Sequence, residues 1–321
     1  MIEIRGLTKR FGDLVALNNL TLEIGPGEVF GFIGPNGAGK STTMKILACL
    51  LRPDSGSVKV GGLDVRTDGD EIRKIIGYMP DFLGVYEDLT VDEYLQFFAA
   101  AFKIERKRRR KVVDSVLELT DLTVKRRAMV DSLSRGMQQR LGVARVLIHE
   151  PKVLLLDEPA SGLDPRARIE MRSLLTELGR MGKVLLVSSH ILTELGEMST
   201  SIGIIERGTL LYSGSLQDAL SRVRGGERIG VVLETGGATA RSLKLKLEAD
   251  ARVAKVIDVP TENGTASGGP PKVIVELTPG QHGHHFLLEL LVASGARVAS
   301  FTPEGVKLED AFLKLTTGAL Q

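Results

Sequence analysis

A glycine-rich segment near the N-terminus carries residue types that could hold a polyphosphate. It has a glycine, four further residues and then Gly-Lys-Ser, and its members are Gly34, Pro35, Asn36, Gly37, Ala38, Gly39, Lys40, Ser41 and Thr42. Glycines let a backbone bend tightly and point its N–H groups inward, and the positive end of a following helix adds to the attraction for phosphate. Lys40 supplies a point charge for the β- and γ-phosphates, and the hydroxyl of Ser41 is suited to Mg²⁺. The segment therefore predicts a phosphate loop.

Two carboxylates follow an apolar run further along the chain. Residues 153–156 are Val-Leu-Leu-Leu, and Asp157 and Glu158 come directly after them. In a parallel α/β sheet the carboxyl ends of the strands gather at the ligand crevice, so we expect these side chains there. We expect Asp157 to hold Mg²⁺, directly or through water, and Glu158 to polarise an attacking water. A phosphate loop alone leaves kinases, GTPases, helicases and transport ATPases open.

A third segment narrows the class. It precedes a strongly amphipathic helix and consists of Leu133, Ser134, Arg135, Gly136, Met137 and Gln138. This segment resembles the signature motif of ABC-type ATPases, and other motifs of that family follow in the expected order. The resemblance extends to a D-loop at Ser161, Gly162, Leu163 and Asp164, a switch histidine at His190 and an adenine-stacking aromatic at Phe11. It covers about residues 1–220.

The resemblance implies an ATPase that binds ATP and Mg²⁺ and works as a homodimer. In that family two ATPase domains face head to tail, and each signature closes on the nucleotide held by the other. The signature also has a physical interpretation, because the Ser134 hydroxyl can cap the helix and form a second anion site with the amides near Gly136. We therefore expect Glu158 and His190 to be catalytic, and Ser134 and Gly136 to act across the dimer interface.

Two features depart from the family pattern. The signature has Arg135 and Met137 where the commonest family form has Gly and Gln, and Gln138 stands one residue later as a candidate substitute. At the Q-loop position the chain has Asp81 where the family usually has glutamine. Aspartate keeps an oxygen for Mg²⁺, but it is shorter and adds a negative charge beside the phosphates. We expect hydrolysis to persist, with Ser41, Asp157 and Asp81 as the metal ligands.

The elements that must position these residues follow from apolar periodicity. Residues 28–33 are expected to form the buried strand that enters the phosphate loop, and residues 42–50 the helix that leaves it. Residues 2–5 and 15–24 alternate as half-buried antiparallel strands, with a turn at 9–12. From about residue 90 to residue 148 apolar residues recur at three- and four-residue spacing, which predicts a helical insert. Strands and helices then alternate, which predicts a parallel sheet covered on both faces.

The predicted fold is α/β, and it has two domains. Residues 1–220 are expected to form a P-loop NTPase of ABC type, with a mixed core sheet, an antiparallel β subdomain and the helical insert. A composition shift at 221–227 predicts a linker. Residues 228–321 follow the order strand, helix, strand, strand, helix, strand, with a last helix at 307–316. That order predicts a small ferredoxin-like α+β accessory domain, which could regulate, sense a ligand or stabilise the dimer.

Composition limits the location and the partners. The net charge is +2, so there is no global electrostatic case for nucleic acid, and none is expected as a partner. Cys49 is the single cysteine, which excludes a disulfide framework within the chain. No apolar run approaches the ~20 residues that cross a bilayer, so we expect a cytoplasmic protein that has no membrane span of its own. A translocation pathway would lie on a separate polytopic membrane permease, which would hold the chain on the cytoplasmic face of the membrane.

The subgroup is indicated by three further segments. Residues 77–80, 87–90 and 307–316 resemble those of the ATPase subunits of ABC-2 type exporters. The resemblance implies an ATP-hydrolysing subunit that powers export through the separate permease. The alternative is a soluble, non-transport ABC ATPase that remodels a protein or nucleoprotein complex, and it would share every nucleotide-binding residue.

One charged run in the helical insert has two possible interpretations. Residues 106–111 are Arg-Lys-Arg-Arg-Arg-Lys. The run fits a solvated first turn of a helix, and it also fits attraction to anionic lipid head groups if this face lies near a membrane.

Overall fold

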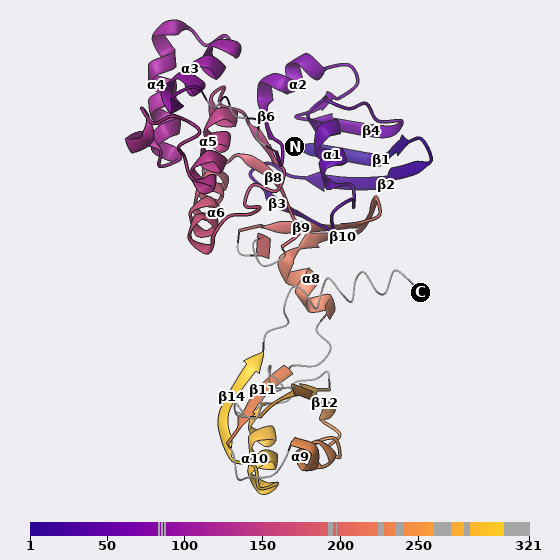
Figure 1. Cartoon of the computed structure of the whole chain (residues 1–321). Helices are drawn as coiled ribbons and strands as arrows, with labels where there is room; N and C mark the ends of the chain where they lie inside the picture. The colour runs from indigo at the N-terminus through magenta and orange to yellow at the C-terminus, as the bar shows by residue number, and fades with distance from the viewer. Residues whose placement is uncertain are drawn as a thin grey trace. The chain divides into compact units, whose positions relative to one another are not determined.

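The computed structural model describes residues 1–82, 84, 86, 88–191, 195–196, 198–223, 228–234, 240–259, 271–278 and 283–304. These residues form two compact units, one within Met1–Leu216 and the other within Gln217–Lys314 (Figure 1). Each unit has its own apolar core.

The first unit is built on a six-stranded sheet with the order β10-β9-β3-β8-β7-β6. Along the sheet these strands are Thr209–Ser215, Ser201–Glu206, Val29–Ile33, Val184–Ser189, Val153–Leu156 and Ile76–Met79. All neighbouring pairs are parallel except β10 with β9. Every residue of β3, β7 and β8 is buried, as expected of parallel strands covered on both faces. The strand predicted to enter the phosphate loop is β3, and it lies inside the sheet.

A second, antiparallel sheet has the order β2-β1-β4-β5. Its strands are Leu14–Ile24, Ile2–Phe11, Ser55–Val60 and Leu63–Asp64. The turn predicted at residues 9–12 is wrong, because β1 continues to Phe11 and pairs Phe11 with Leu14. Only Gly12 and Asp13 remain between the strands, and Gly12 has a positive φ of 58°. The turn therefore lies at Gly12 and Asp13, at the end of the predicted range, and residues 9–11 belong to the strand.

Helix α1, Lys40–Leu47, lies between the two sheets. Its buried Met44, Ile46 and Leu47 join one apolar core with residues of both sheets. The helix begins two residues before the predicted start, and it is three residues shorter at its end, where Cys49 has a left-handed φ of 57°. The core holds the start of α1 against the end of β3, which positions the loop between them.

Helices occupy most of the predicted insert and lie together beside the β6 edge of the core sheet (Figure 1). They are α3 (Val91–Ala101), α4 (Arg106–Leu119), the short η1 (Thr123–Lys125) and α5 (Arg135–Leu147). Thr90 and Glu93 form a reciprocal capping box that starts α3. Two further helices flank the insert in sequence, α2 (Gly69–Ile75) and α6 (Pro165–Arg180).

The second unit confirms the predicted ferredoxin-like order. It runs β11 (Arg228–Leu233), α9 (Ala240–Leu247), β12 (Val253–Val259), β13 (Lys272–Leu277), α10 (His285–Ala293) and β14 (Val298–Glu304). The four strands are antiparallel in the order β12-β13-β11-β14, and buried residues of both helices pack on one face. Residues 221–223, expected to begin the linker, belong to α8 (Leu216–Val223), and residues 224–227 lie outside the described residues.

The last helix predicted, at residues 307–316, also lies outside the described residues. None of the helices in the described ranges has both the length and the apolar character that crossing a bilayer requires.

Candidate active site

The phosphate loop leaves the buried end of β3 and leads directly into α1. Glycine is required at two of its positions. A Cβ on Gly34 would lie 2.3 Å from the carbonyl oxygen of Ile205. A Cβ on Gly39, where φ is +112°, would lie 2.9 Å from the carbonyl oxygen of Ala16. Backbone atoms of β9 and β2 therefore lie too close to these two glycines for any side chain, and a side chain at either position would deform the loop.

Lys40 is buried at the first position of α1 and turns back over the loop. Its ammonium group donates to the carbonyl oxygen of Gly34 at 2.5 Å and to that of Pro35 at 3.3 Å. The same Nζ lies 3.3 Å from Oε1 of Glu158, an ion-pair distance at which no aligned hydrogen bond forms. Ser41 is exposed beside it, and Thr42 is half-buried. A phosphate entering the loop would meet a cation that is already positioned.

Asp157 and Glu158 follow β7, and one hydroxyl on the neighbouring strand contacts both residues. The Ser188 hydroxyl donates to Oδ1 of Asp157 at 2.6 Å and accepts the backbone N–H of Glu158 at 2.9 Å. Asp157 is only 2% exposed. This buried contact fixes the carboxylate of Asp157 and the backbone of Glu158 together at the end of the sheet.

Glu158 lies between the ammonium group of Lys40 and the imidazole of His190. Its Oε2 is 2.8 Å from Nδ1 of His190, and its Oε1 faces Lys40. The residue has a left-handed φ of 50°, which is uncommon for a side chain of this size. His190 follows β8 and its side chain is partly exposed. The structure thus brings together Lys40, Glu158 and His190, three residues predicted from widely separated segments.

Asp81 lies near the same carboxylates. Partial burial, and next the charges of Asp157 and Glu158, raise the pKa of Asp81, whereas Arg135 and His190 oppose that shift. Tyr78 belongs to the same neighbourhood, because burial, then Asp157 and Asp81, raise the pKa of its phenol to about 12. The hydroxyl oxygen of Tyr78 is buried and has no hydrogen-bond partner in the described part of the chain. A negative field therefore extends from Glu158 to Asp81.

The residues present fit a magnesium ion. Asp157, Asp81 and Ser41 offer carboxylate and hydroxyl oxygens, the ligands that Mg²⁺ prefers. In the described ranges no three acidic, histidine or cysteine side chains gather closely enough to hold a metal on their own. Mg²⁺ usually takes one or two carboxylates and completes its coordination with substrate phosphates and water.

The signature residues start α5. Ser134 is the N-cap, and its hydroxyl accepts the backbone N–H of Met137 at 3.4 Å, as its residue type predicts. Leu133 is buried below the helix start. Gln138 donates to the carbonyl oxygen of Val130 at 3.3 Å, so its amide is engaged within its own chain. Gln138, the candidate substitute for the family's glutamine, therefore stabilises the loop that precedes α5.

The D-loop starts α6 in the same manner. Asp164 is the N-cap and accepts the N–H of Ala167 at 2.9 Å, while Leu163 is buried. The loop begins where the Ser161 N–H donates to the carbonyl oxygen of Glu158 at 3.0 Å. Gly162 has a positive φ of 67°, and a Cβ there would lie 2.4 Å from the guanidinium carbon of Arg135. The unusual arginine of the signature thus lies directly against the D-loop.

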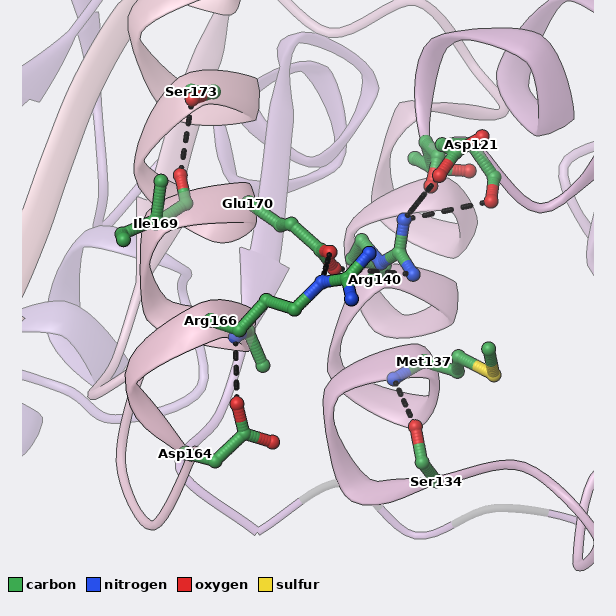
Figure 2. A network of polar contacts seen from close by, with 11 residues as sticks. Asp121, Ser134, Met137, Arg140, Asp164, Arg166, Ile169, Glu170 and Ser173 are labelled. Atoms are coloured by element: carbon green, nitrogen blue, oxygen red, sulfur yellow. Dashed lines mark hydrogen bonds and ion pairs between the residues drawn. The ribbon is translucent and has the colours of Figure 1, made fainter.

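Figure 2 shows how α5 and α6 are held side by side. A Cβ on Gly136 would lie 2.8 Å from that of Ala167, so the first turns are in close contact. Further along, the guanidinium of Arg140 lies 3.5 Å from Glu170 and 3.0 Å from Asp121 at the end of α4. Arg140 is 8% exposed and also donates to the carbonyl oxygen of Thr120 at 3.2 Å. These contacts make the signature and the D-loop parts of one packed unit.

Phe11, the predicted adenine-stacking residue, ends β1 with its ring 49% exposed. Lys9 lies over this ring, with its ammonium 5.5 Å from the centroid. An exposed aromatic at the end of a strand offers a flat surface for a base.

Sequence reasoning missed Ser188 and Arg140. Ser188 lies in an apolar strand just before His190, and a hydroxyl in a fully buried strand is the signal that could have identified it. Arg140 belongs to the stretch expected to precede the amphipathic helix, but α5 already begins at Arg135 and Arg140 is buried within it. Both roles depend on which strand or helix is the neighbour in space.

Comparison with known proteins agrees with this geometry. Residues 17–161 match the family model described as ABC transporter. The chain is 37% identical to the daunorubicin resistance ATP-binding protein DrrA3 of Streptomyces coeruleorubidus, over 76% of this chain and 77% of that protein. It is 32% identical to the Nod factor export ATP-binding protein I of Burkholderia orbicola, over 100% of this chain and 98% of that protein.

Solved structures give the same result for the first unit. An ATP-binding cassette solved as a dimer in a post-hydrolysis state, bound to ADP and Pi, superposes with a TM-score of 0.61 and 28% identity. The match covers 67% of this chain and 99% of that one. Another structure, of the ATP-binding subunit of an ABC transporter, has a TM-score of 0.62 and 27% identity over 69% of this chain and 92% of that one. The chain belongs to the ABC transporter ATP-binding proteins, ATPases with a P-loop fold whose hydrolysis of ATP is coupled to transport.

Proposed function

We propose that this chain is the ATP-hydrolysing subunit of an ABC-2 type exporter and drives a cargo outward through a separate permease. The observation that carries the catalytic part is the position of Glu158, which lies between Lys40 and His190. The export part is supported by the relatives named for drug resistance and Nod factor export.

ATP would bind along the loop that joins β3 to α1. Phe11 stacks the adenine, and the backbone N–H groups of residues 34–42 surround the phosphates. Lys40 exchanges its contacts with Gly34, Pro35 and Glu158 for the β- and γ-phosphates. Ser41, Asp157 and Asp81 would hold Mg²⁺, which supplies neutralisation of charge on the phosphates.

Hydrolysis would use the carboxylate and imidazole that face each other. Glu158 orients a water and accepts its proton as the water oxygen bonds to the γ-phosphorus, and the bond to the β-phosphate oxygen breaks to leave ADP. His190 contacts Glu158 at 2.8 Å and can stabilise the charge that develops beside the γ-phosphate. Ser188 fixes the backbone of Glu158 and the carboxylate of Asp157 while this happens.

The site would be completed by a second copy of the chain. Ser134 and Gly136 at the start of α5 offer a hydroxyl and helix N–H groups to the γ-phosphate bound by the partner. Two copies therefore close head to tail around two nucleotides, and hydrolysis reopens them. The dimeric cassette that resembles this chain supports this arrangement.

The helical insert would transmit that motion to the permease. A groove of about 260 Å³ lies between the insert and the core sheet, and Tyr78, Phe98, Phe102, Arg145 and His149 are among its lining residues. Tyr78 lines this groove and Asp81 follows it by three residues, so a permease segment bound in the groove would be linked to the nucleotide site through this short stretch of chain. The chain would then lie on the cytoplasmic face of the membrane, held by its partner.

Purification of the tagged chain from native membranes in mild detergent tests the proposal. A polytopic membrane protein in stoichiometric amount is the expected result, and it would identify the chain that selects the cargo. A soluble partner with full ATPase activity in the cytosolic fraction would overturn the exporter assignment.

A further inference from the structure

The start of α4 and the residues beside it form a strongly charged surface. We call it the basic face, and its members are Lys74, Lys103, Arg106, Lys107, Arg108, Arg110 and Lys111. All seven side chains belong to exposed residues, whereas the apolar Val113, Val116 and Leu117 of α4 are buried on the other side of the helix.

The fold leaves most of this charge unbalanced. In the part of the chain that the structure describes, Lys107 pairs with Glu105 at 3.0 Å and Lys74 with Glu71 at 2.5 Å. No ion pair in that part engages Lys103, Arg106, Arg108, Arg110 or Lys111.

These cations also destabilise the start of α4. Helix α4 has no acidic residue in its first turn, and its N-cap Glu105 forms no side-chain cap hydrogen bond and pairs with Lys107, so most of the positive charge at the helix start is uncompensated. Arg106 with Arg110, and Lys107 with Lys111, are like charges four residues apart on one helix, an arrangement that destabilises it. An anionic partner would relieve both repulsions.

An exposed aromatic ring lies next to the cations. Phe102 is 43% exposed, and its ring stacks on His149 with centroids 4.0 Å apart. Phe102 and His149 line a cavity of about 390 Å³ together with Lys74, Lys103 and Arg108, and Glu105 and Glu150 also line it. The same two residues line the groove assigned above to the permease. The basic face therefore continues directly from that groove, and it combines cations with aromatic rings, as surfaces at membrane interfaces do.

We propose that the basic face rests on the anionic phospholipid head groups that surround the permease. The proposal rests on the proposed function, since it needs the groove to face a membrane protein. The seven cations exceed the chain's net charge of +2, so the rest of the chain is net negative and is repelled by the same lipids. This asymmetry orients the subunit and places the groove toward the bilayer before the permease is engaged.

A nucleic acid is the competing polyanion, and the structure favours it less. Binding along a duplex needs a basic stripe that follows the backbone over many phosphates, whereas the cations here are confined to one helix start and its immediate neighbours. A flat head-group layer needs only one such area.

Flotation of the purified full-length chain with lipid vesicles tests the proposal. Vesicles of phosphatidylcholine alone are compared with vesicles that contain one-third phosphatidylglycerol, at low and at physiological salt. The variant replaces Arg106, Arg108, Arg110 and Lys111 with glutamine, and the matched control replaces four exposed cations elsewhere, Arg5, Lys59, Lys246 and Lys255.

We expect binding only to the anionic vesicles, and it should weaken as salt is raised. Each basic residue near an anionic surface contributes about a factor of five, so loss of all four should weaken binding by up to about 600-fold, with the control close to the wild-type value. The variant should also melt at a higher temperature, because glutamine is a good helix former and the like-charge repulsion is gone. Equal binding by variant and control, or tighter binding to duplex DNA than to vesicles at equal phosphate concentration, would overturn the proposal.

The failure of the inference can be separated from that of the exporter assignment. If the permease co-purifies with the wild type and the vesicles do not bind, the basic face has another role and the exporter assignment stands. If the vesicles bind through the basic face and only soluble proteins co-purify, the lipid contact stands and the exporter assignment fails. ATPase activity in detergent should be the same in variant and control, because no substituted residue lies in the nucleotide site.

Discussion

Glu158→Gln should separate two roles of one carboxylate. Glutamine keeps the size of the side chain and loses both the charge and the proton-accepting oxygen. Glu158 Oε1 lies 3.3 Å from the Lys40 ammonium, and Oε2 lies 2.8 Å from His190. The substitution therefore removes the base expected to activate water, and it also releases Lys40 from a competing anion.

The magnitudes follow from those contacts. Loss of a general base lowers turnover by about 10²–10⁴-fold. The gross attraction between unit charges 3.3 Å apart is about 5 kcal/mol at an effective dielectric constant of about 20. Desolvation of the buried pair cancels most of that attraction, and a remainder of about 1 kcal/mol would tighten ATP binding about fivefold. A dimer that keeps its ATP should then persist for much longer than the wild-type dimer.

Three measurements on the same preparation test this reasoning: ATP turnover, ATP affinity by titration, and molar mass in the presence of ATP and Mg²⁺. Glu150→Gln is a matched control, because Glu150 is exposed and has a similar left-handed φ of 55°. Turnover within about tenfold of the wild-type rate would remove Glu158 from the role of base. Weaker ATP binding in the variant would refute the release of Lys40.

Three further substitutions have definite expected outcomes. Arg140→Ala should lower the free energy of unfolding by about 1–3 kcal/mol in urea titrations, because it removes the buried hydrogen bond to the carbonyl oxygen of Thr120 together with the contacts to Glu170 and Asp121; a change below about 0.5 kcal/mol would contradict this. Asp81→Gln should leave the dissociation constant for ATP within a few-fold, and complete loss of binding would refute the assignment of Asp81 as an auxiliary ligand. Burial lowers the pKa of His149, so the folded state resists its protonation and loses stability as pH falls below the ordinary value of about 6.5. The drop in melting temperature from pH 7.5 to pH 5 should therefore be smaller in His149→Gln, and equal drops would contradict this.

Much of the fold could be predicted because local chemistry demands it. The spacing of Gly34, Gly39 and Lys40 admits few backbone shapes, because the carbonyl oxygens of Ile205 and Ala16 leave no room for a side chain at either glycine. The order of elements in residues 228–304 was sufficient to predict the ferredoxin-like sheet. The turn expected at 9–12 lies at 12–13 instead, because β1 and β2 stay paired as far as Phe11 and Leu14, which the local sequence does not reveal.

The contacts that organise the candidate site depend on the tertiary structure. Ser188 contacts Asp157 and Glu158 only because β7 and β8 are neighbours in register, which no spacing in the sequence reveals. Arg135 was identified as a departure from the family pattern, but its contact with Gly162 depends on the packing of α5 against α6. The residue types were predictable, and their partners were not.

The parallel packing of α5 and α6 has an electrostatic consequence. Gly136 contacts Ala167 and Arg140 contacts Glu170, so the two helices run in the same direction with Ser134 and Asp164 at neighbouring ends (Figure 2). Parallel macrodipoles side by side repel each other, and their positive poles add to one field. Asp164 already brings one carboxylate to the start of α6, and a further negatively charged group placed before both helix starts would reduce the repulsion more. If a second copy closes as proposed, the phosphates of the nucleotide that it brings would supply that negative charge.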